Sequence, residues 1–121
     1  MQRMTYLWKM ASIRLEKFSA LIRKELSVIF QKKGNEWFSG AIITVTLVRI
    51  SPDLGYAKVY VSLFPSEKKE SVMKWLKENH FAVRRELGLA VGKQMRKIPE
   101  LQFFFDDSME YAAEIDRLLK K

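Results

Sequence analysis

The segment "SGAIITVTLVRISPDLGYAKVYVSLF", residues 39–64, sets the architecture of the chain. Residues 39–50 are rich in Val, Ile and Thr, and residues 55–64 alternate apolar with polar side chains. Such alternation is typical of a strand with one buried face. Between the two halves, "SPDLG" has Pro at the second position of a turn, followed by Asp and Gly, as turns prefer. The segment therefore predicts an antiparallel hairpin.

The second strand of this hairpin has a polar face as well as an apolar one. Lys58 and Tyr60 alternate with Ala57, Val59 and Val61, so they lie on the opposite face. A cation and an aromatic ring there could pair with and stack on RNA. An aromatic side chain on a strand also packs within the sheet without any ligand, and the pattern leaves both interpretations open.

A helix is predicted before the hairpin, over residues 12–30, because apolar side chains recur there at helical spacing. Ser12 is a suitable N-cap, and "QKKGNEW" predicts the end of the helix, with lysines in its last turn and Gly34 just beyond. Residues 1–11 are expected to form a loosely held N-terminus. They lack the apolar core and small-residue cleavage site of a signal peptide.

Two helices are predicted after the hairpin. The first begins in "PSEKKESVMKWLKENH", with Ser66 as N-cap and Trp75 among the inward-facing side chains. A bend is expected near Asn79, where unusual backbone angles are tolerated, and the second helix is expected to begin near Phe81 or Ala82. This second helix presents one apolar face and one basic face.

The chain closes with a short strand and a helix. Residues 101–105 read as a strand, and Asp106, Asp107 and Ser108 are expected to cap a final helix over residues 108–121. An acid–base or metal role for the two aspartates is the alternative. The predicted order is α-β-β-α-α-β-α in one domain, residues 1–121, which indicates an α+β fold with a three-stranded sheet.

The net charge of +8 favours a polyanionic partner, and its distribution locates the surface. Residues 1–37 carry +5 and residues 66–100 carry +4, whereas residues 101–121 carry −2. We predict an RNA-binding face on the second of the paired helices, extended by cations of the first helix. Its proposed members are Arg84, Arg85, Gly88, Gly92, Lys93, Arg96 and Lys97, with Arg14, Lys17 and Lys24.

The two glycines of this face need a reason, because each costs a helix about 1 kcal/mol relative to alanine. Gly88 and Gly92 would let another backbone approach closely, and that backbone could be a strand, a helix or a phosphate chain.

The sequence argues against an enzyme. It contains no cysteine, one histidine, and no common phosphate-loop or hydrolase motif. His80 as a catalyst is the alternative, but its position favours a junction residue between two helices. We expect no metal and no cofactor. The absence of cysteine and of a long apolar run fits a soluble, cytoplasmic protein that does not bind membranes.

The β-α-α-β order over residues 57–105, preceded by a helix and a strand, is that of a type II KH domain. The helix junction of that RNA-binding fold normally carries G-x-x-G, which clamps single-stranded backbone. The junction here reads "ENHFAVRRELG", so we expect a helix–kink–helix at Asn79, His80 and Phe81 in place of the clamp.

Three segments in the same order resemble the ribosome-binding factor A family of bacterial small-subunit assembly factors. They are "SIRLEKFSALIRKELSVIF", "ISPDLGYAKVYVSLF" and "MRKIPELQFFFDDSMEYAAEIDRLLKK". The chain departs from the family in two places. "KKGNEWFSG" stands where the family commonly has Asp-Pro-Arg, and Asn79, His80 and Phe81 stand where its kink has Ala-x-Gly.

The resemblance implies a type II KH-like fold and a non-enzymatic function. A protein of this family binds the immature 30S subunit and its 16S rRNA and assists late maturation and 5′-end processing, including in the cold. We also expect a monomer, with an assembly GTPase as a second partner. Two alternatives stay open: a protein-binding αβ adaptor, and a KH-like RNA-binding protein not tied to the ribosome.

Overall fold

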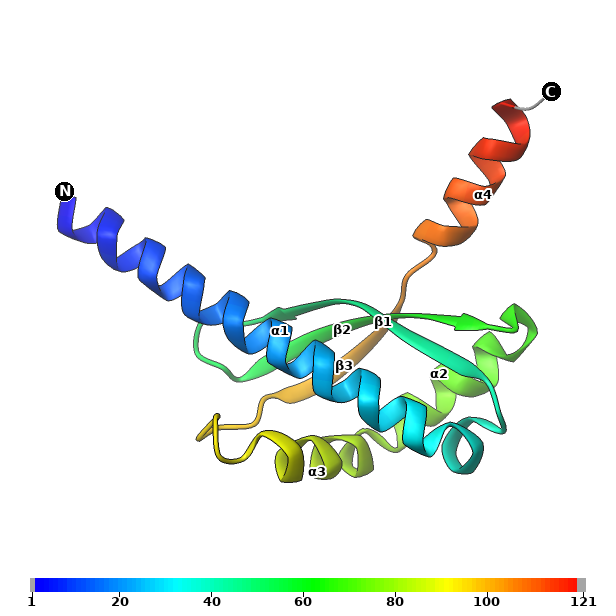
Figure 1. The fold of residues 1–121 in the computed structure, drawn as a ribbon, viewed down its shortest axis with the longest axis horizontal. Coiled ribbons are helices and arrows are strands. Elements are labelled where there is room, and N and C mark those ends of the chain that lie inside the picture. Colours follow the sequence, from blue (N-terminus) through cyan, green and yellow to red (C-terminus); the bar gives the residue numbers. More distant parts are fainter. Residues whose placement is uncertain (1, 120–121) are drawn as a thin grey trace.

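The computed structural model describes the backbone of residues 2–119 and the side chains of residues 13–108 and 115–119. Its elements follow the predicted order α-β-β-α-α-β-α, with one short 3₁₀ turn, η1, added before the second helix (Figure 1). They are α1 (Gln2–Phe38), β1 (Ile42–Ile50), β2 (Tyr56–Phe64), η1 (Ser66–Lys68), α2 (Lys69–Glu78), α3 (His80–Val91), β3 (Glu100–Phe105) and α4 (Ser108–Leu119).

The three strands form one sheet in the order β1-β2-β3. β1 and β2 are antiparallel, as the hairpin prediction required, and β3 lies parallel to β2 on its other side. The turn is held by Asp53, whose Oδ1 accepts hydrogen bonds from Ser51 Oγ (2.7 Å) and the Gly55 amide (3.0 Å). A β-bulge between Val45 and Leu47 adds one residue to β1, so that the edge strand bends.

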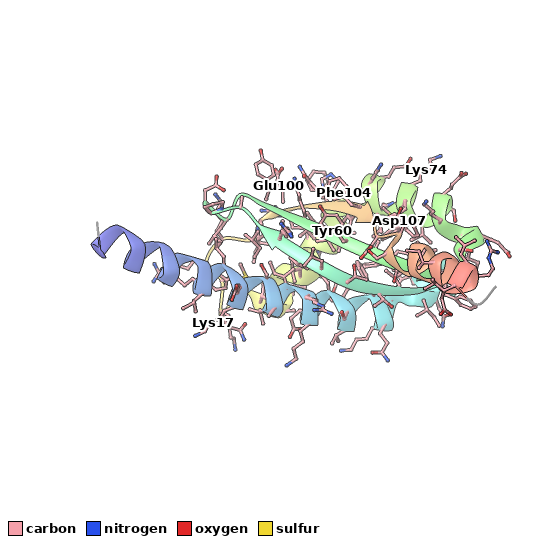
Figure 2. The ribbon with its side chains drawn as sticks, turned by 90° about the horizontal axis from the view of Figure 1, so that it is seen from above. Lys17, Tyr60, Lys74, Glu100, Phe104 and Asp107 are labelled. Atoms are coloured by element: carbon pink, nitrogen blue, oxygen red, sulfur yellow. The ribbon has the colours of Figure 1, made fainter. Side chains whose placement is uncertain are left out.

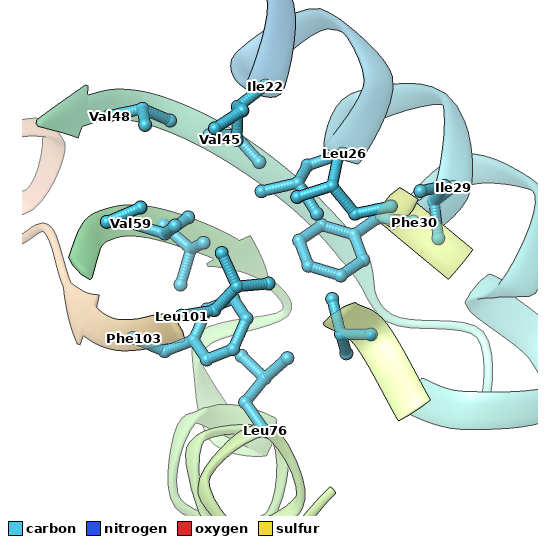
Figure 3. Packing of buried hydrophobic residues seen from close by; sticks show 14 of the residues in the cluster. Ile22, Leu26, Ile29, Phe30, Val45, Val48, Val59, Leu76, Leu101 and Phe103 are labelled. Carbon is cyan, nitrogen blue, oxygen red and sulfur yellow. The ribbon is translucent and has the colours of Figure 1, made fainter. Parts of the chain in front are cut away.

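Helices α1, α2 and α3 pack on one face of this sheet, and none of the described elements covers the other face (Figures 1 and 2). The core lies between the helices and the apolar face of the strands (Figure 3). It contains side chains from α1, α2, α3 and all three strands, among them Ile22, Leu26, Phe30, Val45, Val59, Leu76, Leu87, Leu101 and Phe103. The α-β-β-α-α-β order and the one-sided helical layer make this a type II KH-like α+β fold.

Helix α1 is longer at both ends than the sequence predicted. It begins at Gln2 rather than at Ser12, since residues 2–11 contain no Gly or Pro to interrupt it; the Ser12 side chain lies outside the described residues. It also continues through Gly34 to Phe38. There the Phe38 ring packs edge-on against the rings of Phe30 and Trp75, with centroid distances of 5.4 and 5.3 Å. Aromatic packing of this kind outweighs the helix penalty of one glycine.

The start of α2 also differs from the prediction. Ser66 is not its N-cap, because residues Ser66–Lys68 form η1 and neither η1 nor α2 has a side-chain cap hydrogen bond. The inward-facing side chains are as predicted, with Val72 and Leu76 buried and Trp75 half-buried.

Helix α3 ends earlier than its basic pattern predicted. It stops at Val91, whose carbonyl accepts hydrogen bonds from the amides of Gln94 and Met95 (both 2.9 Å). Lys93, Arg96 and Lys97 therefore lie on the α3–β3 loop, residues 92–99, and not on a helix face. Ala90 and Gln94 are exposed, and Met95 of the loop is buried.

Asp106 connects the sheet to α4. Its Oδ1 accepts a hydrogen bond from the Ser108 amide (2.9 Å), and its Oδ2 accepts one from Thr46 Oγ1 at the bulge (2.6 Å). The predicted capping role is thus borne out for Asp106, while the Asp107 side chain is exposed. From this point α4 extends away from the body of the domain (Figure 1). Over residues 2–119, no helix is long and apolar enough to cross a membrane.

Candidate nucleic-acid interface

Three segments that are far apart in the sequence meet at one end of the domain. They are the first half of α1, the β1–β2 turn and the α3–β3 loop (Figure 1). Between them runs an open groove of about 810 Å³, which we call the basic groove. It is lined by Ile13, Arg14, Leu15, Lys17, Phe18, Pro52, Leu54, Gln94, Met95, Arg96 and Lys97.

Four cations line the basic groove. Arg14 and Lys17 are three residues apart on α1, which places them on neighbouring positions of the helix surface, and Arg96 and Lys97 come from the loop. All four side chains are exposed, and none has a hydrogen bond or ion pair with the described residues. Their charges are therefore available to an anionic ligand.

Among the described residues, no acidic side chain lines the groove, and Asp53, between the lining residues Pro52 and Leu54, supports its geometry. Asp53 holds the turn through its hydrogen bonds, and these bonds, from Ser51 first and then the Gly55 amide, lower the pKa of its carboxyl group. The positive charge of Lys97 also contributes to the lower pKa, which indicates that Lys97 lies near the turn. The turn and the α3–β3 loop therefore lie close together at the rim of the groove.

The other lining side chains are largely apolar. They include Leu15 and Phe18 of α1, Leu54 of the turn and Met95 of the loop. A groove with cationic walls and an apolar lining suits a nucleic-acid strand, because the cations neutralise phosphates while sugars and bases contact the apolar atoms.

Arg84 has a different place from the one predicted. Its Nη2 donates to the Ile98 carbonyl (2.7 Å) and its Nε to the Pro99 carbonyl (3.2 Å), so the half-buried guanidinium joins α3 to the loop. A side chain held in this way positions Arg96 and Lys97 but offers little of itself to a phosphate. The structure gives Arg84 the role of a clamp on the α3–β3 loop.

The remaining predicted cations are exposed but do not line the groove. Arg85 lies on α3, Lys93 on the loop, and Lys24 on α1, beyond the part of the helix that forms the groove wall. The structure therefore unites four of the eight predicted cations in one concave site.

The two glycines differ in their surroundings. A Cβ atom at Gly92 would lie 2.7 Å from the Gly88 carbonyl oxygen, closer than real Cβ contacts. The backbone that approaches Gly92 is therefore the chain's own. At Gly88 the nearest atom to a Cβ would be Ile98 Cγ1, at an ordinary 3.7 Å, so a methyl group would fit.

The helix junction consists of one non-helical residue. Asn79 (φ −116°, ψ 26°) separates α2 from α3, and its Nδ2 and amide both donate to the Trp75 carbonyl (3.0 and 2.8 Å). His80 is the first residue of α3 and its ring lies 4.1 Å from that of Phe81, which is 70% exposed. Among the described residues, no group of three His, Asp or Glu side chains could hold a metal ion.

Two walls of the groove carry no local sequence signal. Pro52 and Leu54 belong to the predicted turn and Arg14 and Lys17 to the predicted first helix, and no local pattern indicates what lies opposite them. A long-range contact between α1 and the α3–β3 loop would have been needed to identify the site.

The chain was compared with known proteins. A family model described as ribosome-binding factor A matches residues 14–119. The chain is 40% identical over 112 residues to ribosome-binding factor A of Cytophaga hutchinsonii, covering 93% of this chain and 84% of that protein. It is 44% identical over 110 residues to the protein of the same name from Chlorobaculum tepidum, covering 90% of each.

Solved structures of the same name have a similar fold. The crystal structure of ribosome-binding factor A from Thermus thermophilus superposes with a TM-score of 0.62 at 26% identity, covering 74% of this chain and 93% of that one. A Thermus thermophilus homology model fitted into a cryo-EM map of a 30S–RbfA complex gives a TM-score of 0.60 at 27% identity, covering 74% and 91%. The family match over most of the chain, the curated relatives and the shared fold lead to one conclusion: this chain belongs to the ribosome-binding factor A family.

Proposed function

We propose that this protein binds the immature small ribosomal subunit and contacts its 16S rRNA through the basic groove. The observation that carries the proposal is the convergence of Arg14 and Lys17 with Arg96 and Lys97 on one groove that no acidic side chain lines. The relatives' name and the fitting of a similar chain into a 30S complex support the choice of partner. We further propose the family's finer roles: assistance in late maturation and 5′-end processing, including in the cold, and release by an assembly GTPase.

The mechanism is binding and positioning rather than catalysis. The four groove cations neutralise phosphates of one rRNA strand and release its counterions, which makes the affinity depend on salt. The apolar lining contacts sugars or unpaired bases, and the Arg84 clamp keeps the loop cations in place before the RNA arrives. Arg85, Lys93 and Lys24 extend the positive surface around the groove.

Sedimentation with purified immature small subunits tests this proposal. The variant Arg96→Glu/Lys97→Glu should lose co-sedimentation at moderate salt. The matched control Lys32→Glu/Lys74→Glu has the same change in net charge, but on exposed side chains outside the groove, and should sediment with the subunit like the parent chain.

The salt dependence of binding gives a second measurement. The logarithm of the affinity should fall linearly with the logarithm of salt concentration, and each groove cation removed should reduce the slope by about one. Equal slopes for the groove variant and the control would rule out the groove as the contact surface. Free migration of the parent chain at every salt concentration would instead favour the protein-binding adaptor.

A further inference from the structure

The uncovered face of the sheet carries two rows of outward side chains, none of which lines the basic groove. In the first row, the strand register places Leu47 of β1, Tyr60 of β2 and Phe104 of β3 side by side. In the second row, Arg49, Lys58 and Gln102 are neighbours in the same way. We call these six residues the sheet-face platform. Tyr60 and Phe104 are both on the side of the sheet that faces the viewer in Figure 2.

The first row presents aromatic rings to solvent. The Tyr60 and Phe104 rings are stacked, with centroids 5.4 Å apart and an interplanar angle of 27°. Tyr60 is half-buried in the stack, whereas Phe104 and Leu47 are each 40% exposed. Two nearly parallel rings on a flat, uncovered sheet offer an apolar surface on which an unpaired base can stack.

The second row places two like charges opposite each other. Arg49 and Lys58 are paired across β1 and β2, an arrangement that destabilises a sheet unless an anion compensates it. Neither side chain has a hydrogen bond or ion pair with the described residues, and both are exposed. The nearest acid in the strand register is Glu100, which is paired with Tyr56 at the start of β2, two residues from Lys58, and has no ion pair with either cation.

These cations lie in a depression of about 440 Å³ next to the aromatic row. It is lined by Arg49, Ile50, Ser51, Tyr56, Lys58 and Gln102. Tyr56, Lys58 and Tyr60 alternate along β2, so an exposed and a half-buried ring flank a cation, with roughly 7 Å between successive positions on that face. Tyr56 is 50% exposed and supplies a second ring on the other side of the cationic pair.

We propose that the sheet-face platform is a second RNA site, which binds a short single-stranded segment. One base stacks on Phe104 and Tyr60, and the phosphate beside it lies between Arg49 and Lys58. The next base contacts Tyr56, and Gln102 offers its amide to a base edge. The inference rests on the proposed function for the choice of RNA as the polyanion. The exposed rings favour unpaired bases over a duplex, and the uncompensated cations favour RNA over an apolar protein segment.

NMR titration of the full-length chain with single-stranded octauridylate tests the proposal. Amide shifts are expected at residues 47–49, 56–60 and 102–104. Phe104→Leu keeps an apolar side chain but removes the ring, and should weaken binding about fivefold or more, because stacking on one aromatic ring typically contributes at least that factor. Lys58→Gln should reduce the salt slope by about one. Lys74→Glu, on the exposed surface of α2, is the control and should bind octauridylate no more than about twofold more weakly.

Three results would overturn the proposal. The first is a failure at the platform: either the amide shifts are confined to the basic groove, or Phe104→Leu and Lys58→Gln both bind octauridylate with unchanged affinity. The second is equal perturbation of the platform by a short RNA duplex. The third is a nuclear Overhauser contact between Leu118 of α4 and the Phe104 ring in the free chain, which would show that α4 occupies this face.

The same titration separates this inference from the proposed function. The groove variant Arg96→Glu/Lys97→Glu should keep its octauridylate shifts on the platform. A chain that fails to sediment with small subunits but still binds octauridylate at the platform would refute the proposed function and leave the second site standing.

Discussion

Among the single residues, Arg84 controls where the loop cations lie. Its two hydrogen bonds reach carbonyls fourteen and fifteen residues further along the chain, and they fix the α3–β3 loop against α3. Because the loop carries Arg96 and Lys97, the shape of the basic groove depends on a residue that does not line it. Arg84 is therefore a positioning residue.

Replacing Arg84 with Met should loosen the loop. The two charge-assisted hydrogen bonds are lost, which we expect to cost about 1.5–3 kcal/mol of the free energy of unfolding. Hydrogen exchange of the amides at residues 93–98 should become faster, and binding to small subunits should weaken. Arg84→Lys should recover only part of both effects, because an ammonium group lacks the planar fork that reaches two carbonyls. Unchanged exchange in Arg84→Met would show that the loop is held by other contacts.

Alanine substitutions at Gly88, within α3, and at Gly92, just after it, should change the stability of the domain in opposite directions. Gly92→Ala brings a methyl group to 2.7 Å from the Gly88 carbonyl, so we expect destabilisation of about 1–3 kcal/mol. Gly88→Ala has room for the methyl group and should stabilise the helix by up to about 1 kcal/mol. Thermal unfolding of both variants measures the difference. Weaker binding of a well-folded Gly88→Ala chain to small subunits would indicate that RNA approaches this glycine.

Among the elements, those whose contacts are local were predicted best. The hairpin follows from the alternation in β2 and from the turn residues, because both signals lie within a few residues of the structure that they specify. The end of α1 was misread because Phe38 is held by Trp75, which lies far along the chain. The basic groove was predicted only as separate cations, since no local pattern brings α1 to the α3–β3 loop.

The start of α4 should depend on pH through Asp106. Hydrogen bonds lower the pKa of its carboxyl group below the usual 3.8. The bond from Ser108 has the largest effect, followed by the bond from Thr46. Folding therefore favours the charged form. The resulting stabilisation is complete above the usual pKa and is lost as the pH falls through the lower pKa of the folded state.

An NMR titration of the Ser108 amide from pH 7 to pH 2 measures this dependence. Its midpoint should lie below 3.8, and Asp106→Asn should abolish the titration. Asp107→Asn, next to it in the sequence, should leave the Ser108 curve in place. A midpoint above 3.8 would contradict the hydrogen-bonded state of Asp106.

In the whole molecule, the sheet separates two surfaces of different character. The helices bury one face, and the basic groove lies where they meet the turn at one end of the domain. The other face keeps its aromatic and cationic rows in solvent. Of the 22 Lys and Arg residues, four line the basic groove and two lie on the sheet-face platform.

The domain should remain folded without α4. The described apolar side chains of α4, Ile115, Leu118 and Leu119, are all exposed and contribute nothing to the core. A chain that ends at Asp107 should therefore unfold cooperatively, with a melting temperature within a few degrees of the full chain, as measured by circular dichroism. Loss of the cooperative transition would show that α4 stabilises the sheet.

The parallel pairing of β2 with β3 also sets an order of assembly. β1 joins β2 through a tight turn. The partner on the other side of β2 is β3, which is synthesised only after the crossover of residues 65–99. Until then a nascent chain exposes the unpaired edge of β2 and the apolar side chains Val59 and Val61, which are a template for pairing with other chains. The last strand therefore protects the growing polypeptide from aggregation, and synthesis that stalls before Phe105 leaves it unprotected.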